Sequence, residues 1–414
     1  MEKHNIVIIG GGPAGMAAAV AAYDRGARDI VILDRDAHLG GILQQCIHNG
    51  FGLHKLGKEL TGPEYAAVYE EMVAKRDICV YYETMVTAIS SDRIVTAQNR
   101  DGILKIQAAA IILAMGCRER SRGALNICGE RPAGIYSAGT AQKLINCQGY
   151  MVGKRVVILG SGDIGLIMAR RMSLEGAKVE AVCELMPYSG GLTRNIVQCL
   201  EDFSIPLYLS TTVAQIHGNR HLEGVTIAQV DENRQIKPET SRYIPCDTLL
   251  LSVGLIPENE LTRGAGILMD PITGGAMVDD RCQTSVPGIF ACGNVLHVHD
   301  LVDYVSEEAE RAGMAAAQLV LGENTDGTFA PTKPGKGVRY VLPQRICTNR
   351  DGALFLRVSE PKSNVRLVVS SGDTVLASFK RRKVAPGEME KLPLTAAMLE
   401  KCTETITVSL EEVE

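Results

Sequence analysis

Tryptophan is absent from this chain of 414 residues, and tyrosine and phenylalanine together contribute only 18. Neither sign of charge is in large excess, because 43 Lys and Arg face 48 Asp and Glu and leave a net charge of -5. Nucleic-acid-binding proteins usually carry a strongly basic face. We therefore expect no nucleic-acid partner. The length predicts two to four domains, each large enough to bury its own core.

Long unbroken apolar runs are also lacking. The apolar stretch nearest the N-terminus, residues 5–22, is interrupted by three glycines and a proline at positions 10–13. It suits neither a membrane-spanning helix nor the apolar part of a signal peptide. The sequence therefore predicts a soluble, cytoplasmic protein without a transmembrane segment.

Closely spaced cysteine pairs are missing as well. The chain has 12 cysteines, scattered from Cys46 to Cys402, and none forms a Cys-x-x-Cys motif. A chain of this length does not need disulfides to hold its core together. We expect most of the cysteines to be reduced and to act as small buried hydrophobic residues.

Two similar strand–turn–helix–strand units are present instead. In the first, a β-branched run at residues 5–9 leads into a glycine-rich turn, an Ala-rich helix at 16–25 and a second strand at 30–33 that ends on Asp34. In the second, a run at 155–159 leads into a similar turn, a helix at 166–174 and a strand at 179–183 that ends on Glu184. In both copies the acid follows the first glycine of the turn by 24 residues, which indicates an internal duplication.

The two glycine-rich turns have the pattern of dinucleotide-binding sites. In each, the first glycine permits the tight turn, the second lets the backbone approach a pyrophosphate, and the third lets helix and strand pack closely. The terminal acid lies where a carboxylate accepts hydrogen bonds from the adenosine ribose. A 2′-phosphate about 4 Å from Glu184 would cost about 4 kcal/mol at an effective dielectric constant of 20. No Arg or Lys lies between residues 183 and 191 to offset this cost, so we expect NADH to be preferred over NADPH.

The remaining sequence consists mainly of short strand-like runs. They include residues 78–82, 94–97, 103–106 and 109–113 between the two units and 248–252 after them, and a helix is expected at 306–321. Residues 324–337 are rich in Gly and Pro and read as a linker. Residues 338–414 predict a small β-rich domain with a basic run at 380–383. Such a run suits a solvated strand edge that discourages pairing, and the alternative is docking to an acidic partner.

With these motifs, residues 5 to 322 resemble the pyridine nucleotide-disulfide oxidoreductases, a superfamily of flavoproteins with two dinucleotide-binding domains. The resemblance implies an α/β fold with two Rossmann-like domains, an FAD domain at 1–118 and 249–323 and an inserted NAD(P)H domain at 119–248. The β-rich domain at 338–414 follows the linker. The expected activity is oxidoreduction with FAD and NADH as cofactors.

The resemblance also assigns residues to each cofactor. Asn294 stands where the family usually has Asp, so a hydrogen bond to the flavin ribityl chain is retained while the charge is lost. The helix after this turn is expected to point its N-terminus at the flavin ring near Tyr304. The implied FAD residues are Gly10, Gly12, Pro13, Ala14, Gly15, Asp34, Arg35, Gly41, Ala114, Gly116, Gly293, Asn294, Tyr304 and Val305. The implied NAD(P)H residues are Gly160, Gly162, Asp163, Ile164, Gly165, Glu184 and Gly254.

The sequence departs from the dithiol members of the superfamily. These place two cysteines after the glycine pair equivalent to 40–41, or a Cys-x-x-Cys in the NAD(P)H domain, whereas this chain has a single Cys46. The run 40–52 resembles a subgroup without the redox disulfide, which includes companion flavoproteins of glycerol-3-phosphate dehydrogenase and the FAD/NAD subunits of opine and amine dehydrogenases and hydrogen cyanide synthase. The expected partner is therefore a dehydrogenase or an iron–sulfur or other electron-transfer protein, and a homo-oligomer is possible.

Two other functions stay open. Cys46, with His48 nearby in sequence, is a candidate catalytic thiol of a self-contained NADH oxidase or peroxidase, and the alternative role for it is to shape the flavin pocket. The third hypothesis is an NADH-sensing flavoprotein that works as a binding module. His297 and His299 have a spacing that suits a metal, but no cysteine or carboxylate pattern completes a ligand set. No metal site is expected, and these histidines are predicted to line the flavin mouth or to bond locally.

Overall fold

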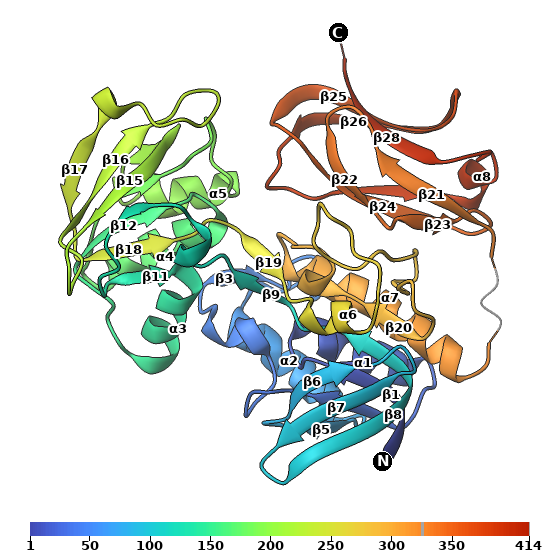
Figure 1. Ribbon diagram of the computed structural model, residues 1–414. Helices are drawn as coiled ribbons and strands as arrows, with labels where there is room; N and C mark the ends of the chain where they lie inside the picture. Colours follow the sequence, from blue (N-terminus) through green and yellow to red (C-terminus); the bar gives the residue numbers. More distant parts are fainter. Residues whose placement is uncertain (324–326, 414) are drawn as a thin grey trace. The chain divides into compact units, whose positions relative to one another are not determined.

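The computed structural model describes residues 1–323 and 327–413, which form two compact units (Figure 1). The first unit combines Met1–Cys117 with Pro257–Glu414, and the second is Arg118–Ile256. The second unit begins at Arg118, one residue before the predicted start of the inserted domain at residue 119. The predicted return of the chain to the first unit at residue 249 is wrong. Strand β18 (Thr248–Leu251) is hydrogen-bonded to β12 (Arg155–Leu159) inside the sheet of the second unit.

The first unit is built on a seven-stranded sheet with the strand order β5-β2-β1-β8-β7-β6, in which β20 also pairs with β8. The first unit's glycine turn lies between β1 and helix α1. The runs predicted at 103–106 and 109–113 are one long strand, β8. The bounds are β1 (Glu2–Ile9), α1 (Pro13–Asp24), β2 (Ile30–Leu33), α2 (Gly62–Ala74), β5 (Cys79–Tyr81), β6 (Met85–Ile89), β7 (Ile94–Asn99), β8 (Gly102–Leu113), α6 (Glu260–Gly264), β20 (Ile289–Ala291) and α7 (Val302–Val320).

Both faces of this sheet are covered, which explains why the second halves of the parallel strands β1 and β8 are apolar and mostly buried. Successive side chains of a strand point to opposite faces. Ile6 and Ile8 belong to the core formed with α1, α2 and α7, whereas Val7 and Ile9 belong to the core on the other face. Helices α1 and α7 approach closely at Gly313, where a Cβ would lie 2.2 Å from the carbonyl oxygen of Ala18.

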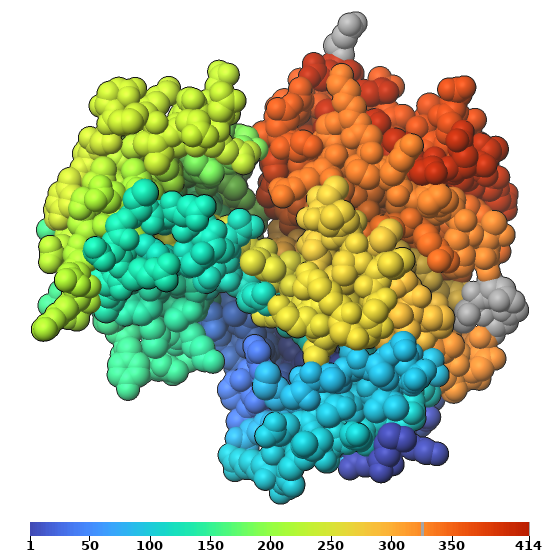
Figure 2. Space-filling view, in the orientation of Figure 1, coloured from blue at the N-terminus to red at the C-terminus, as the bar shows by residue number. Residues whose placement is uncertain are grey.

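The C-terminal segment is β-rich, as predicted, and belongs to the first unit. Its strands form a five-stranded sheet, β23-β21-β28-β25-β26, and a three-stranded sheet, β22-β24-β27. The space-filling view shows this segment against the yellow part of the first unit (Figure 2). The backbone N–H of Val278 donates to Oε1 of Gln344, and Tyr340 and Phe355 join the core on the sheet face opposite α1. The bounds are β21 (Phe329–Pro334), β22 (Val338–Leu342), β23 (Arg345–Cys347), β24 (Gly352–Val358), β25 (Lys362–Ser371), β26 (Thr374–Val384), β27 (Glu390–Leu394), α8 (Ala396–Leu399) and β28 (Ile406–Glu412).

Two predictions for this segment have different outcomes. The linker at 324–337 is wrong over 329–334, because these residues form β21 and pair with β23 and β28; residues 324–326 lie outside the described part of the chain. The basic run at 380–383 lies in β26, which is the edge strand of its sheet. This position matches the prediction of a solvated strand edge, because charged side chains there oppose pairing with another chain.

The second unit has the same topology around its own glycine turn. Its parallel sheet has the order β11-β18-β12-β13-β14, and a four-stranded sheet, β10-β15-β16-β17, covers the face opposite the helices α3 and α4. The bounds are β10 (Cys128–Gly129), β11 (Ile135–Ser137), α3 (Ala138–Gln148), β12 (Arg155–Leu159), α4 (Asp163–Leu174), β13 (Lys178–Cys183), α5 (Thr193–Ile196), β14 (Leu207–Tyr208), β15 (Thr211–His217), β16 (Gly224–Gln229), β17 (Arg242–Pro245) and β18 (Thr248–Leu251).

Among the described residues, no helix is both long enough and apolar enough to span a membrane.

Candidate functional site

The first glycine turn joins the C-terminal end of β1 to α1. Gly10 has a φ of +105°, and a Cβ there would lie 2.5 Å from the carbonyl oxygen of Ala114. A Cβ at Gly15 would lie 1.8 Å from the carbonyl oxygen of Gly10. Two of the three glycines are therefore required by the fold itself, since any side chain at them would overlap the backbone.

Gly12 is different, because the space beside it is open. A Cβ at Gly12 would meet no atom of the described chain within 4 Å. Gly12 is the N-cap of α1, Pro13 is the first helical residue, and no side chain caps this end of the helix. Gly41 lies next to it, where a Cβ would be 3.2 Å from the Cα of Gly12. An uncapped helix N-terminus with open space beside its glycine is a suitable seat for a pyrophosphate.

Asp34 is held in place at the end of β2. Its Oδ2 accepts a hydrogen bond of 2.5 Å from the backbone N–H of Gly11, and its Oδ1 accepts one of 2.8 Å from the N–H of Asp36. Burial raises the pKa of Asp34 and outweighs these two hydrogen bonds, which lower it. Arg35, the next predicted FAD residue, is exposed.

The second unit repeats this arrangement with different side chains. Glu184 accepts hydrogen bonds from the backbone N–H of Ser161 at 2.9 Å, from its hydroxyl at 2.6 Å and from the N–H of Met186 at 2.9 Å. Ser161 follows the first glycine of its turn directly, as Gly11 does in the first unit. Met186 follows the acid by two residues, as Asp36 does. A Cβ at Gly160 would lie 2.0 Å from the carbonyl oxygen of Ser252. The duplication therefore extends to the hydrogen bonds that orient each carboxylate.

The helix of the second unit also begins with an uncapped glycine. Gly162 is the N-cap of α4, and no side chain caps it. Asp163, in the first turn, accepts hydrogen bonds from the backbone N–H of Leu192 at 2.8 Å and from the Asn195 amide at 2.6 Å. Gly165, like Gly15, packs against the backbone of the first glycine, because a Cβ there would lie 2.6 Å from the carbonyl oxygen of Gly160. Ile164 is partly buried beside it.

A second glycine pair completes the repeat and was missed in the sequence analysis. Gly190 and Gly191 follow Glu184 at the same distance as Gly40 and Gly41 follow Asp34. In the first unit the N–H of Gly40 donates to the carbonyl of Gly11 at 2.9 Å, and in the second the N–H of Gly190 donates to the Ser161 hydroxyl at 3.2 Å. Extending the comparison of the two copies by seven residues would have found this pair.

Gly116 and Gly254 occupy equivalent positions in the two units. Each lies three residues after a parallel strand that neighbours the first strand of its unit, β8 in one and β18 in the other. Their φ angles are +72° and +104°, and a Cβ at either would meet no described atom within 4 Å. Both therefore leave open space at the edge of the sheet where the glycine turn lies.

The turn at Gly293 lies against the start of α1. A Cβ at Gly293 would be 2.8 Å from the Cβ of Ala14, and its N–H donates to Oε1 of Glu308 at 2.8 Å. Asn294 uses both ends of its amide, since Nδ2 donates to the thiol of Cys117 at 3.6 Å and Oδ1 accepts the N–H of His299 at 3.0 Å. The structure thus brings the predicted residues Ala14, Gly293 and Asn294 into one place.

Helix α7 begins at Val302, so Tyr304 and Val305 lie in its first turn. Asp303, in the same turn, is buried and accepts the backbone N–H groups of Gly52 at 3.3 Å and Lys55 at 2.9 Å. The loop that follows Cys46 is therefore tied to the start of α7. This contact places the two segments that the sequence analysis assigned to the flavin side by side.

Cys46 follows a short 3₁₀ helix (Gly41–Gln45) and is partly buried. Its thiol donates to the carbonyl of Ile42 at 3.3 Å, and its own carbonyl accepts the N–H of Gly62 at 2.8 Å. The His48 ring lies 5.1 Å from that of Phe51. No two cysteines of the described residues form a disulfide, but only six of the twelve are buried, so the expectation that most are buried was wrong.

Three side chains meet below the Gly293 turn. His297 and Glu308 are joined at 3.0 Å, and Nε2 of His299 lies 3.6 Å from the other oxygen of Glu308. Burial lowers the pKa of His297 to about 4. Burial also raises the pKa of Glu308, but the neighbouring His299 and His297 outweigh it and leave that pKa well below its usual value. The carboxylate that the sequence pattern lacked is thus Glu308, supplied by α7.

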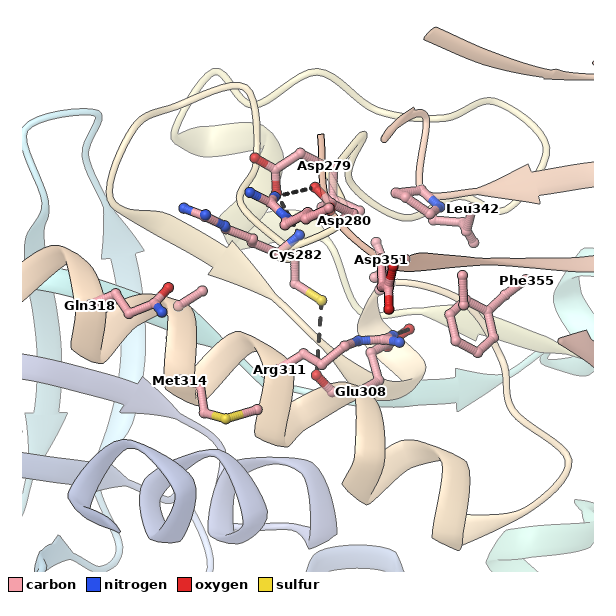
Figure 3. Close-up of a pocket in the computed structure, with 18 residues that line it drawn as sticks. Asp279, Asp280, Cys282, Glu308, Arg311, Met314, Gln318, Leu342, Asp351 and Phe355 are labelled. Carbon is pink, nitrogen blue, oxygen red and sulfur yellow. Dashed lines mark hydrogen bonds and ion pairs between the residues drawn. The ribbon is translucent and has the colours of Figure 1, made fainter. Parts of the chain in front are cut away.

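A cavity of about 430 Å³ lies between α7, the turn at 279–282 and the C-terminal strands (Figure 3). Glu308 and Arg311 of α7, Cys282 and Phe355 line it. It is separate from both glycine turns.

The residues around each turn fit a dinucleotide. Each unit offers an uncapped helix N-terminus and a hydrogen-bonded carboxylate at the end of the neighbouring strand. The space beside Gly12 is open, and a Cβ at Gly162 would meet only the Ser252 hydroxyl, at 3.6 Å. Such sites bind the phosphates through backbone N–H groups and the ribose through the acid.

Comparison with known proteins agrees with this geometry. The family model described as "Pyridine nucleotide-disulphide oxidoreductase" matches residues 4–318. The thioredoxin reductase of T. acidophilum superposes with a TM-score of 0.63 at 25% identity, covering 77% of this chain and 99% of that one. A bacillithiol disulfide reductase from Bacillus cereus, at 19% identity, has a TM-score of 0.61 and the same fold, covering 78% of this chain and 99% of that one.

Curated relatives include one of the subunits of alkyl hydroperoxide reductase of Pseudomonas aeruginosa, which is 28% identical over 77% of this chain. This chain spans 59% of that relative's length. A ferredoxin–NAD(+) reductase component of a 3-phenylpropionate/cinnamic acid dioxygenase, from Photorhabdus laumondii, is 26% identical over 81% of this chain and 80% of its own length. One of the subunits of opine oxidase of Agrobacterium tumefaciens is 24% identical over 78% of this chain and 66% of its own length.

Proposed function

Because the chain belongs to the pyridine nucleotide-disulphide oxidoreductase family, whose members bind FAD and NAD(P)H, we propose that it exchanges electrons between NADH and a partner protein. The proposal assigns FAD to the glycine turn of the first unit and NADH to that of the second. The observation that carries it is the repeated hydrogen bonding of Asp34 and Glu184 beside two uncapped helices. One binding site of this kind suits a dehydrogenase, whereas two suit a flavoprotein that exchanges electrons with a nicotinamide.

The cofactors supply the chemistry, which is hydride transfer between the nicotinamide and the flavin. The chain's own residues bind and orient them. Asp34 and Glu184 would accept hydrogen bonds from the ribose hydroxyls, and the backbone at Gly12 and Gly162 would receive the two pyrophosphates. Gly293 and Asn294, with the first turn of α7, hold the flavin end of FAD. No protein acid or base is required for this half of the reaction.

The partner is inferred from the sequence around Cys46 and from the relatives. The run 40–52 holds one cysteine rather than the pair used for dithiol exchange. Two relatives are named as parts of larger systems, one a ferredoxin–NAD(+) reductase component and the other one of the subunits of opine oxidase. We therefore favour a protein acceptor or donor, either a dehydrogenase or an iron–sulfur protein, over a small disulfide. In this reading Cys46 shapes the flavin pocket.

A second candidate is reduction of peroxide through Cys46. The relative that favours it is named as part of an alkyl hydroperoxide reductase, although this chain spans 59% of that relative. A thiol that reduces peroxide must be accessible and must form a sulfenate. Cys46 is partly buried, with its sulfur directed to the carbonyl of Ile42.

Turnover with different acceptors separates these two functions. We expect the FAD-loaded protein to reduce an iron–sulfur protein or a partner dehydrogenase with NADH, and the Cys46→Ser variant to retain this rate within about threefold. Serine cannot form a sulfenate or a mixed disulfide, so a peroxidase that uses Cys46 would lose its peroxide turnover in that variant. The exposed Cys147→Ser variant is the matched control. Peroxide turnover in the wild type that disappears in Cys46→Ser alone would contradict the proposed partner.

A further inference from the structure

The cluster of His297, His299 and Glu308 is buried directly below the Gly293 turn. Each residue offers one ligand atom, and these atoms lie within 4.8 Å of one another. The side chains of the three residues are 1%, 2% and 5% exposed. His297 and His299 come from the loop after the turn, and Glu308 comes from α7.

The second ring nitrogen of each histidine is held by a neighbour. Nδ1 of His297 lies 3.3 Å from the hydroxyl of Tyr340, and Nδ1 of His299 lies 3.3 Å from Oδ1 of Asn294. The backbone N–H of His299 donates to the same Oδ1, which identifies that atom as oxygen. Nδ1 of His299 therefore carries a proton, and Nε2 is the ring atom that faces Glu308. Metal-binding histidines are usually oriented by a neighbour in this way.

The distances between the three groups are short enough for one metal ion to contact all three. Nε2 of His297 is 3.0 Å from Oε2 of Glu308, and Nε2 of His299 is 3.6 Å from Oε1. The longer distance exceeds a side-chain hydrogen bond. Bond lengths of about 2.0 to 2.2 Å to a tetrahedral zinc place neighbouring ligand atoms about 3.3 to 3.6 Å apart. The 3.6 Å distance lies at the upper end of this range, and the 3.0 Å distance is slightly shorter than it.

The nearby charges leave room for a cation. Arg357 acts on His297, and its ion pair with Asp300 at 3.5 Å offsets part of its charge. Arg311 lies 3.8 Å from Glu308, but its side chain is 31% exposed and its guanidinium stacks 4.6 Å over the ring of Phe355. Water therefore screens much of the Arg311 charge.

We propose that His297, His299 and Glu308 bind a divalent transition ion of the zinc class. Two histidines and one carboxylate are a known ligand set for zinc and for other first-row metals. Glu308 also lines the cavity of Figure 3, whereas His297 and His299 do not. The ion would fix the Gly293 turn, since Glu308 accepts the N–H of Gly293 and Asn294 holds His299. This inference is independent of the electron acceptor.

Metal content tests the proposal in the full-length, FAD-loaded protein. After treatment with a chelator, addition of Zn²⁺ and dialysis, we expect wild type to retain about one equivalent more zinc than His299→Ala or Glu308→Gln, measured by elemental analysis. The exposed His221→Ala variant is the matched control and should behave like wild type. Equal zinc in all four proteins would overturn the proposal.

Because the chain has 12 cysteines, the ligands must also be identified. With Co²⁺ in place of Zn²⁺, we expect the visible absorption of a nitrogen and oxygen site without thiolate charge-transfer bands, and this absorption should be lost in His299→Ala. Thiolate bands that persist in His299→Ala, with no other signal, would contradict the proposal. If the variants do not fold, anomalous scattering at the zinc edge from wild-type crystals decides it. A peak between the three side chains is expected, and a zinc-soaked crystal without one would refute the site.

Discussion

The Gly12→Leu variant is expected to fold and to lose its FAD. A side chain at Gly12 meets no described atom within 4 Å, so the chain itself has room for it. That space is the one assigned to the pyrophosphate, and a leucine there would fill it. We expect the dissociation constant for FAD to rise by about 100-fold or more, which corresponds to about 2.7 kcal/mol. Flavin absorbance after gel filtration and titration of the apoprotein with FAD measure the effect.

Two other glycines serve as controls for this experiment. Gly264 also has open space around it and lies at the exposed end of α6, so Gly264→Leu should keep its flavin. Gly15→Ala should instead damage the fold, because its Cβ would lie 1.8 Å from the carbonyl oxygen of Gly10. A Gly12→Leu protein with unchanged flavin affinity would show that the pyrophosphate does not lie beside Gly12.

The choice of nucleotide should depend on the charge of Glu184. We expect NADH to reduce the protein at least about tenfold more efficiently than NADPH. A like charge at about 4 Å costs about 4 kcal/mol at an effective dielectric constant of 20, and the partial exposure of Glu184 reduces this penalty through screening by water. Glu184→Arg should remove or invert the preference. The measurement is the rate of flavin reduction with each nucleotide over a range of concentrations.

The control variant for this prediction is Glu184→Gln. Glutamine keeps an oxygen that can accept the N–H of Ser161 but removes the charge. It should therefore narrow the preference for NADH without the loss of loop structure that arginine could cause. A wild-type protein that prefers NADPH would show that Glu184 does not face the ribose.

The sequence predicts the parts of the fold that local patterns determine. Strands β2 and β12 have the predicted bounds, since both are short β-branched runs bounded by polar or glycine residues. Both helices after the glycine turns begin three residues before the predicted start, at Pro13 and Asp163. The reason is that the second glycine is already the N-cap, so the third lies inside the helix.

Contacts between distant segments were beyond the sequence patterns. The spacing of His297 and His299 showed no third ligand, because Glu308 reaches them only when α7 packs below the turn. Likewise, no pattern in the sequence of the C-terminal strands predicted the contact between Tyr340 and His297. The predicted domain boundary at 249 is wrong for a similar reason. Strand β18 is a run of buried apolar residues that suits the parallel sheet of either unit, and only its pairing with β12 assigns it to the second.

Anaerobic titration of the purified flavoprotein with NADH tests the proposed electron transfer most directly. Two dinucleotide sites and a single cysteine in the run 40–52 imply a centre that accepts two electrons per FAD. One equivalent of NADH should therefore bleach the flavin completely, in wild type and in Cys46→Ser alike. A protein that binds FAD and NADH but whose flavin is not reduced, or one that needs two equivalents of NADH, would contradict the proposed function.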